Sequence, residues 1–394
     1  MNYTHTIIGA GIIGLATAIK IKEKFPESDI LVIEKEDGVA RHQTGNNSGV
    51  IHSGIYYKPG SLKALNCRRG YDLLIKFCND NDIRYDICGK IIVAANENEI
   101  PVLKNLLERG EQNGLENLKE LNAEDLKNYE PNVKGIGGIY VPQTGIVDFI
   151  EVADKIYSNL VEEGVEFRFY EKVDSVKIED DVIISTNLST IKTEKLINCA
   201  GLHSDKVAAM TEKHLKIRII PFRGEYYKLK REKRNLINNL VYPVPDPSFP
   251  FLGVHFTRMI KGGVEAGPNA VFSFKREGYS KFAFNLGDTL SSFAWPGFRK
   301  LIRKYWKVGA GEFYRSYSKK AFVNALKKLV PAVEENDLER GGAGVRAQAC
   351  DIDGNLLDDF YIIENQNVFH VVNAPSPAAT SALAIGEHIA QRVG

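Results

Sequence analysis

The sequence has few cysteines and none of the spacings that hold a zinc ion. Its 394 residues include five cysteines, with no Cys-x-x-Cys pair. They are scattered along the chain, at Cys67, Cys78, Cys88, Cys199 and Cys350. An odd, scattered set is typical of reduced thiols in an intracellular protein and not of a disulfide framework. We therefore expect no metal site and a cytoplasmic protein.

A charge excess of either sign is also absent. The 51 basic and 50 acidic residues are mixed through most of the chain, so the charge gives no reason to expect a nucleic-acid partner. The first 19 residues contain no Lys, Arg, Asp or Glu. They also lack a basic segment ahead of the apolar run, and Thr4, Thr6 and three glycines interrupt it. This stretch fits a buried strand and turn better than a signal peptide or a membrane span.

The clearest pattern is a strand, a glycine-rich turn, a helix and a second strand within residues 4–34. An apolar run leads into Gly9-Ala10-Gly11-Ile12-Ile13-Gly14, and a helix is predicted from there to about Phe25. The first glycine permits a tight turn, the second lets the backbone approach a pyrophosphate, and the third lets helix and strand pack closely. About twenty residues later, Glu34 can accept both hydroxyls of an adenosine ribose and would repel the 2′-phosphate of NADP. A dinucleotide site is predicted; the alternative is a glycine-rich turn without a ligand.

Two later segments are predicted to belong to the same nucleotide-binding fold. Residues 195–201 are predicted as a strand ending in Cys199-Ala200-Gly201, whose turn would close over the same nucleotide unless it is a purely structural strand end. Near the C-terminus, two strands lead into a run of small residues, where Pro377 can occupy the first position of a helix. A helix N-terminus favours negative charge, such as that of a reduced flavin.

Three other segments have distinct compositions. Residues 41–57 combine glycine with small polar residues, which suits a loop laid against an extended ligand. Strand patterns between residues 217 and 271 predict a second sheet, inserted within the nucleotide domain. Residues 290–330 are rich in Lys and Arg with interleaved aromatics. This basic segment is either a solvated pair of helices or a face for a membrane or an acidic partner.

Several motifs carry a resemblance to a known family. They are Gln43-Thr44-Gly45-Asn46-Asn47-Ser48-Gly49-Val50-Ile51-His52-Ser53-Gly54-Ile55-Tyr56-Tyr57, Gly267-Pro268-Asn269-Ala270-Val271, Gly344-Val345-Arg346-Ala347-Gln348 and Asn373-Ala374-Pro375-Ser376-Pro377-Ala378-Ala379-Thr380-Ser381. With the N-terminal unit and the Cys199-Ala200-Gly201 turn, they resemble the D-amino-acid-oxidase superfamily of FAD enzymes. More narrowly, they are similar to the L-2-hydroxyglutarate dehydrogenase/oxidase family over almost the whole chain. Many members have a bulkier polar residue where Asn46 stands, so Asn46 is given no catalytic role.

The resemblance implies FAD as cofactor and oxidation of L-2-hydroxyglutarate to 2-oxoglutarate, by hydride transfer from C2 to flavin N5. It also implies that the electrons pass to a quinone or to oxygen. We further expect a peripheral contact with the inner face of the cell membrane through the basic segment. The alternatives are another enzyme of the superfamily, oxidising glycine, sarcosine or glycerol 3-phosphate, and a flavin-binding subunit without catalysis.

The expected architecture is α/β (α+β overall), a Rossmann-like FAD-binding domain with an inserted antiparallel-sheet substrate domain. A chain of 394 residues exceeds one ordinary hydrophobic core, which favours two domains. The FAD-binding domain is predicted to be discontinuous and to comprise residues 1–82, 146–214 and 340–394. The substrate domain is predicted to comprise residues 83–145 and 215–339, including the basic helical segment 290–330.

The candidate catalytic residues are His52, His255 and Arg346. A neutral imidazole can take the hydroxyl proton, with an unperturbed pKa of about 6.5. The loop context favours His52, whereas His255 is expected to approach from the opposite side. Arginine can hold a carboxylate with two parallel hydrogen bonds, and Arg346 is ranked ahead of Arg223, Arg258 and Lys63. The predicted cofactor-binding residues are Gly9, Gly11, Gly14, Glu34, Lys35, Thr44, Asn47, Ser48, Gly49, Val50, Val173, Ala200, Gly201, Arg346, Pro375, Ser376, Pro377, Ala378, Ala379 and Thr380.

Overall fold

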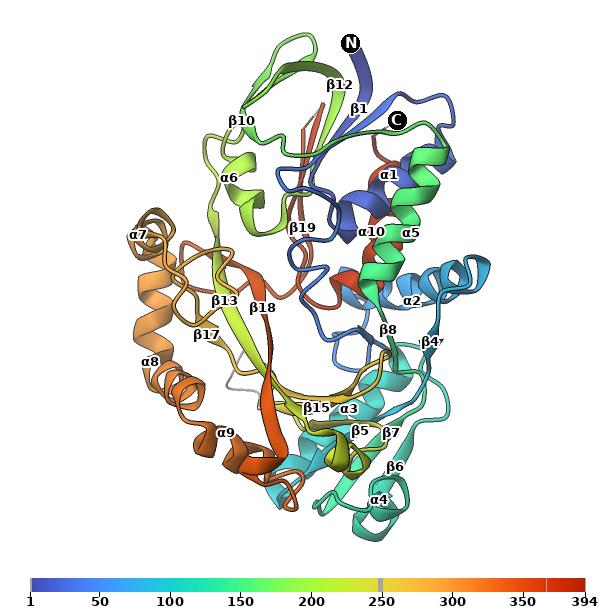
Figure 1. Cartoon of the computed structure of the whole chain (residues 1–394), viewed down its shortest axis with the longest axis vertical. Helices are drawn as coiled ribbons and strands as arrows, with labels where there is room; N and C mark the ends of the chain where they lie inside the picture. Colours follow the sequence, from blue (N-terminus) through green and yellow to red (C-terminus); the bar gives the residue numbers. More distant parts are fainter. Residues whose placement is uncertain (1, 247–250, 366, 394) are drawn as a thin grey trace.

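The structure is a computed structural model that describes residues 2–246, 251–365 and 367–393. Its two large sheets lie toward opposite ends of the long axis, and both chain termini lie at the end that holds the first sheet (Figure 1). Two long strands, β13 (Ile217–Leu229) and β18 (Leu338–Asp351), run side by side between these ends (Figure 1).

The first sheet is assembled from three separate parts of the chain. Its parallel strands have the order β20-β12-β1-β2-β9; β11 and β10 extend it beside the first half of β12, and β19 pairs with β20. The strands are β1 (Asn2–Ile8), β2 (Ile30–Ile33), β9 (Glu166–Arg168), β10 (Val173–Ile178), β11 (Val182–Thr186), β12 (Thr190–Asn198), β19 (Tyr361–Glu364) and β20 (Val368–Asn373). The three segments predicted to form one nucleotide fold are therefore neighbours in a single sheet.

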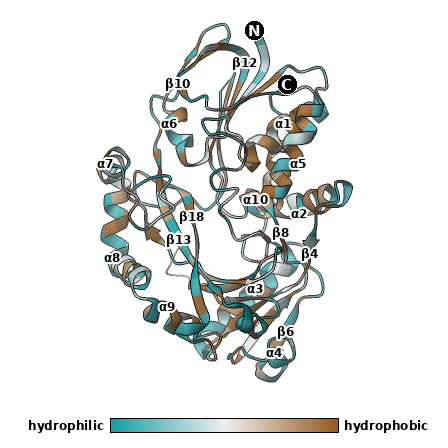
Figure 2. Cartoon of the chain, in the orientation of Figure 1, coloured by the Kyte–Doolittle hydropathy of each residue, from teal (hydrophilic) through white to brown (hydrophobic). Residues whose placement is uncertain are grey.

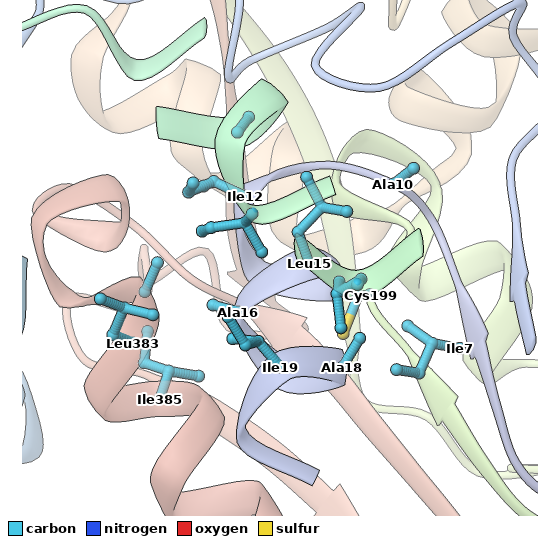
Figure 3. Close-up of a cluster of buried hydrophobic side chains, with 14 of the residues drawn as sticks. Ile7, Ala10, Ile12, Leu15, Ala16, Ala18, Ile19, Cys199, Leu383 and Ile385 are labelled. Atoms are coloured by element: carbon cyan, nitrogen blue, oxygen red, sulfur yellow. The ribbon is translucent and has the colours of Figure 1, made fainter. Parts of the chain in front are cut away.

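Four helices share a buried apolar cluster with one face of this sheet. They are α1 (Ile12–Lys24), α2 (Leu62–Asp80), α5 (Phe149–Glu162) and α10 (Ala378–Ala390). Apolar residues dominate α10 (Figure 2), and Leu383 and Ile385 lie beside Ala16 and Ile19 of α1 (Figure 3). On the opposite face, residues of the parallel strands β1, β2 and β12 share a second apolar cluster with β10, β11 and α6 (Ser204–Ala208). Pro377 precedes α10 as its N-cap residue, one position earlier than predicted.

The second sheet has nine strands and is antiparallel except for the parallel pair β5 and β14. Its order is β17-β13-β16-β15-β14-β5-β7-β6, with β18 on the other side of β13. The remaining strands are β5 (Lys90–Ala94), β6 (Lys119–Asn122), β7 (Gly137–Val141), β14 (Leu240–Pro243), β15 (His255–Arg258), β16 (Val264–Gly267) and β17 (Val271–Phe272). The predicted domain boundary at residue 340 falls inside β18, which pairs with β13 along this sheet.

A small third sheet and the outer helices complete the fold. The third sheet has the order β3-β8-β4, with β3 (Val50–Ile51), β4 (Tyr85–Asp86) and β8 (Gly145–Val147). The outer α-helices are α3 (Ile100–Gln112), α4 (Ala123–Tyr129), α7 (Leu286–Ala294), α8 (Pro296–Tyr317) and α9 (Lys319–Leu326), and the short 3₁₀ turns are Glu97–Glu99, Gly201–His203, Arg231–Leu236 and Glu335–Asp337. The strand β3 lies directly before His52, so this sheet holds the loop that carries the predicted base.

Candidate active site

A cavity of about 770 Å³ lies between the two large sheets. One wall is formed by residues that follow β1, β2, β12 and β20, at the carboxyl ends of the parallel strands, where α/β folds bind ligands. The other wall comes from the second sheet and includes Tyr226, Tyr242, His255 and Arg346. All the predicted cofactor-binding residues except Gly14 and Gly49 line the cavity. The cavity therefore has a nucleotide end and an end that faces the second sheet.

The three glycines after β1 are required for different structural reasons. A Cβ at Gly9 would lie 2.6 Å from the carbonyl oxygen of Cys199, and one at Gly14 would overlap the carbonyl oxygen of Gly9. Packing alone requires both glycines, so Gly14 supports the turn from behind and is not the direct contact that was predicted. A Cβ at Gly11 would meet the Thr44 hydroxyl oxygen no closer than 3.5 Å, and Gly11 faces the cavity. A ligand that approaches the backbone accounts for this glycine, whereas packing does not.

The carboxylate of Glu34 is fixed by backbone amides. Its two oxygens accept hydrogen bonds from Ala10 N at 2.9 Å and Glu36 N at 3.0 Å. Each carboxylate oxygen keeps a second lone pair, so Glu34 can still accept both hydroxyls of a ribose. Lys35, the next residue on the cavity wall, pairs with Glu277 at 2.7 Å.

The polar loop of residues 41–57 is held by its own side chains. The Thr44 hydroxyl accepts a hydrogen bond from Ile12 N at 2.9 Å, at the first turn of α1. Asn47 donates to Thr44 O at 2.6 Å and accepts from Gly49 N at 2.8 Å. A Cβ at Gly49 would lie 2.7 Å from Val147 O, so this glycine packs on β8 behind the cavity wall, contrary to the predicted contact. Thr44 and Asn47 thus shape the wall as well as lining it.

The start of α10 faces the cavity without a side-chain cap. The first N–H groups of a helix have no partner within the helix and favour negative charge. Thr380, in this first turn, accepts a hydrogen bond from His52 N at 3.0 Å and donates to Val50 O at 3.3 Å. The same helix start therefore offers amides to a ligand and positions His52 beside it.

These features fit the FAD that the family resemblance implies. The bare backbone at Gly11 leaves room for a pyrophosphate, and Glu34 retains acceptors for a ribose. The uncapped start of α10 suits the electron-rich edge of a flavin. Ala200 and Gly201, after β12, also line the cavity.

His52 and His255 line the same cavity from different elements, the loop after β3 and the strand β15. His52 Nε2 lies 3.4 Å from the Ser376 hydroxyl oxygen. His255 Nδ1 donates to Gly253 O at 2.8 Å, and its ring stacks on Tyr242 with centroids 3.9 Å apart. Because Nδ1 of His255 is used by a carbonyl, its Nε2 is the nitrogen left to accept a proton.

Both imidazoles are neutral at pH 7. Burial lowers the pKa of His52 well below its usual 6.5, and Lys90, His255 and Lys63 lower it further. Burial lowers the pKa of His255 to about 3. The charges of Lys90 and Arg346 lower it further, whereas the hydrogen bond to Gly253 O opposes the shift. The expectation of a base near its unperturbed pKa is therefore wrong for the free protein, although either ring is ready to take a proton.

Of the four candidate cations, two reach the cavity. Arg346 lines it, donates to Asn269 O at 3.2 Å and lies 5.5 Å from the Phe251 ring centroid; Lys63 lines it and pairs with Asp358 at 2.8 Å. Arg223 is buried against Glu225, with Nε to Oε1 at 3.0 Å, and Arg258 pairs with Asp86 at 3.4 Å. Neither lies on the cavity wall, which agrees with ranking Arg346 ahead of both.

The aromatic part of the cavity wall was not predicted from the sequence. Tyr226, Tyr242 and Phe251 line the cavity with His255 and Arg346. Burial raises the pKa of Tyr226 to about 12, so its phenol stays protonated and can donate a hydrogen bond. Tyr226 falls among the strand patterns between residues 217 and 271, but no sequence signal showed that its side chain is turned toward a ligand.

The chain was compared with known families and proteins. Residues 5–392 match the DAO family model, FAD dependent oxidoreductase. L-2-hydroxyglutarate dehydrogenase of Indibacter alkaliphilus is 56% identical over 388 residues, which are 98% of this chain and 97% of that protein. The mitochondrial L-2-hydroxyglutarate dehydrogenase of Bos taurus is 44% identical over 411 residues, 100% of this chain and 89% of that protein. Both proteins carry the name of the family that the motifs resemble.

Solved structures show the same fold at low identity. The dithionite-reduced L-alpha-glycerophosphate oxidase from Mycoplasma pneumoniae, with FAD bound, has a TM-score of 0.81 at 22% identity, covering 100% of this chain and 94% of that chain. Glycine oxidase from Geobacillus kaustophilus has a TM-score of 0.74 at 15% identity, with 100% and 94% coverage. The predicted α/β fold class is confirmed.

Replacing Gly11 with alanine should weaken cofactor binding without unfolding the protein. The added methyl would project into the cavity, and overpacking by about 1–3 kcal/mol corresponds to roughly 5- to 150-fold in Kd. The flavin-to-protein absorbance ratio after dilution and the far-UV circular dichroism spectrum measure the two effects. The matched control is Gly311→Ala in α8, where a Cβ would meet no atom within 4 Å. Equal flavin retention in both variants would contradict the role of Gly11.

Proposed function

Since this chain belongs to the DAO family of FAD-dependent oxidoreductases, we propose that it is an L-2-hydroxyglutarate dehydrogenase, which oxidises its substrate to 2-oxoglutarate. One observation carries the proposal beyond the likeness to its relatives. Away from its nucleotide end, the cavity is lined by two neutral imidazoles, His52 and His255, and by the cations Arg346 and Lys63. A 2-hydroxy dicarboxylate needs a base for its hydroxyl and a cation for each carboxylate.

FAD, when bound, supplies the acceptor for the hydride that leaves C2 of the substrate. The chain would hold it through the backbone at Gly11, the carboxylate of Glu34 and the first turn of α10. These groups lie along one cavity, so one cofactor could contact all of them.

Arg346 and Lys63 bind the two carboxylates. No carboxylate forms an ion pair with Arg346 within the described ranges of the chain, so its guanidinium can take a substrate carboxylate in a bidentate pair. Lys63 shares its ammonium with Asp358, whose side chain is 94% exposed and can be displaced at little cost. The phenol of Tyr226, protonated at neutral pH, can donate a further hydrogen bond to a carboxylate.

His52 takes the hydroxyl proton as C2 loses its hydrogen. Its backbone amide donates to Thr380 in the helix start that would hold the flavin, so its imidazole would lie beside the reacting carbon. His255 is the alternative base, but the hydrogen bond to Gly253 O and the stack on Tyr242 fix its ring to the second sheet. We assign His255 to positioning the substrate.

The substrate is tested by anaerobic bleaching of the flavin with a panel of donors. L-2-hydroxyglutarate should reduce the flavin, whereas L-lactate leaves one cation of the cavity without a carboxylate. An unpaired buried group costs about 1–3 kcal/mol or more, so kcat/KM for L-lactate should be lower by at least roughly tenfold to hundredfold. Equal rates with both acids, or preferential reduction by glycine, sarcosine or glycerol 3-phosphate, would overturn the assignment. A flavin that no donor bleaches would indicate a subunit without catalysis.

Replacing His52 with asparagine should slow anaerobic flavin reduction by about 10²–10⁴-fold, the usual contribution of a positioned general base. Flavin content should be unchanged, and the matched variant His255→Asn should be affected much less. The base must lose its proton to act, so the acid limb of kcat/KM of the parent should lie below pH 6.5, because the pKa of His52 is depressed. A parent acid limb at or above pH 6.5, or a larger loss in His255→Asn, would reject His52 as the base.

We also propose that the electrons pass to a membrane quinone, with oxygen as the slower acceptor, and that α7, α8 and the loop before them rest on the cytoplasmic face of the membrane. Polar and apolar residues are mixed along these helices (Figure 2). The basic aromatic surface comprises exposed Phe282, Phe284, Leu286, Leu290, Arg299, Arg303, Lys304, Trp306 and Lys307. Not every aromatic of the segment takes part, because Phe298 is buried in the core. No helix in the described part of the chain is long and apolar enough to span a membrane.

The membrane contact is tested by sedimentation with vesicles of anionic or neutral lipid at low salt. Replacing Arg303, Lys304 and Lys307 with serine should weaken binding to anionic vesicles, by about 1 kcal/mol or roughly fivefold for each charge removed. Lys177→Ser on β10, an exposed lysine in the first sheet, is the matched control. Equal sedimentation with both lipids would contradict the membrane contact and favour the alternative, a solvated pair of helices.

A further inference from the structure

Lys90 is a lysine buried in the middle of the second sheet. It begins β5, pairs with Leu240 of β14 and Val141 of β7, and is 1% exposed. Lysine is almost never buried to this degree without a partner that compensates its charge. Nothing in the proposed mechanism so far uses it.

The surroundings of Lys90 contain aromatic rings in place of a carboxylate. Its Nζ lies 4.3 Å from the ring centroid of Tyr242 and 5.0 Å from that of Tyr56. No acidic side chain in residues 2–246, 251–365 and 367–393 forms an ion pair with it. Two ring faces offset only part of the cost of burying an ammonium.

The titratable groups that face Lys90 from the neighbouring elements are also not anions. Burial raises the pKa of the Cys67 and Cys88 thiols to about 12 and 11, and it raises the pKa of the Tyr56 and Tyr242 phenols as well. The charge of Lys90 is also felt by His52 and His255, whose imidazoles are neutral. Burial lowers the pKa of Lys90 itself to about 7.

One aromatic ring separates Lys90 from the cavity. Tyr242 lines the cavity, stacks on His255 at 3.9 Å and has Lys90 over its ring. Lys90 also lies close enough to His52 to depress the pKa of that imidazole. A change of charge on Lys90 is therefore felt by the base and by any anion held between Arg346 and Lys63.

We propose that Lys90 is a positioning residue that provides a countercharge for the dianionic substrate: a dicarboxylate entering the cavity draws a proton onto Lys90, and the ammonium behind Tyr242 strengthens its binding. The same proton transfer protects the base. Two carboxylates beside His52 would raise its pKa and favour its protonation, and the positive charge on Lys90 opposes this. The inference rests on the proposed function for the choice of a dicarboxylate.

The consequence for binding has a definite sign. Below about pH 7 Lys90 of the empty protein already carries its proton, so affinity for the dianion is at its plateau. Above that pH binding must take up a proton, and the affinity falls by up to about tenfold per pH unit. A group that served only as packing would give no such dependence.

The test uses the holoenzyme and 2-oxoglutarate, a dianion that does not turn over. Its Kd is measured from the change in flavin absorbance between about pH 6 and 9, and calorimetry in two buffers of different ionisation enthalpy counts the protons taken up. The parent should lose roughly tenfold or more of its affinity above pH 7 and take up a proton at about pH 8. Lys90→Met should bind weakly at every pH without uptake, and Lys90→Arg, charged throughout, should bind tightly without uptake. Lys177→Met, at an exposed site, should behave as the parent.

The pH dependence of stability gives a second measurement, which a lysine whose ammonium is stabilised by the fold would not reproduce. The pKa of Lys90 is lowered in the folded protein from about 10.4 in the unfolded chain. The cost of burying its charge is therefore fully present below pH 7 and fades as the pH rises toward about 10.4. Lys90→Met should raise the thermal midpoint of the substrate-free holoenzyme, more at about pH 6 than at pH 9.

Two results would overturn the proposal: a parent Kd that is flat above pH 7 with no proton uptake, or a lower thermal midpoint for Lys90→Met at about pH 6. Failure of the proposed substrate would look different. If the parent does not bind 2-oxoglutarate but binds another dianion, such as glycerol 3-phosphate, the same pH series with that ligand still decides the role of Lys90.

Discussion

The contact between the turn after β1 and the turn after β12 is the constraint on which the rest of the structure depends. Gly9 leaves no room for a side chain against Cys199, and Gly14 leaves none against Gly9. This close approach aligns the carboxyl ends of β1, β12 and β20, so that three distant parts of the chain open onto one cavity. Gly11, which packing does not require, then presents bare backbone to that cavity.

The second sheet completes the cavity and makes its two walls chemically different. Its wall is aromatic and cationic, with Arg346 and the stacked pair Tyr242 and His255, while the opposite wall provides His52 and Lys63. Burial and the neighbouring positive groups hold both imidazoles neutral. A site that combines neutral bases with Arg346 and with Lys63, whose partner Asp358 is exposed, is suited to an anion that carries a proton to be removed, which agrees with a hydroxy dicarboxylate.

The loop after β17 fastens the two halves of the molecule at the nucleotide end. Arg276 is buried against Asp205, with Nη2 to Oδ2 at 2.9 Å, and Glu277 accepts from Lys35 at 2.7 Å and His203 at 2.9 Å. Although burial opposes it, the hydrogen bonds from His203 and Lys35 hold the pKa of Glu277 well below its usual range. Glu277, Glu36 and His42 lie close enough to share a cation, and the ammonium of Lys35 already contacts all three.

The sequence by itself determined the dinucleotide fold, because the turn from Gly9 to Gly14 and its distance to Glu34 are local features that few other folds combine. The family followed from the resemblance of longer motifs, such as residues 43–57 and 373–381. The sequence also indicated Arg346 and His52 as candidates, and both line the cavity. Only the tertiary structure decided that Arg223 and Arg258 serve other contacts, because the partners of a strand side chain come from distant parts of the chain. The depressed pKa values and the isolated charge of Lys90 had no sequence signal, since burial is a property of the assembled sheets.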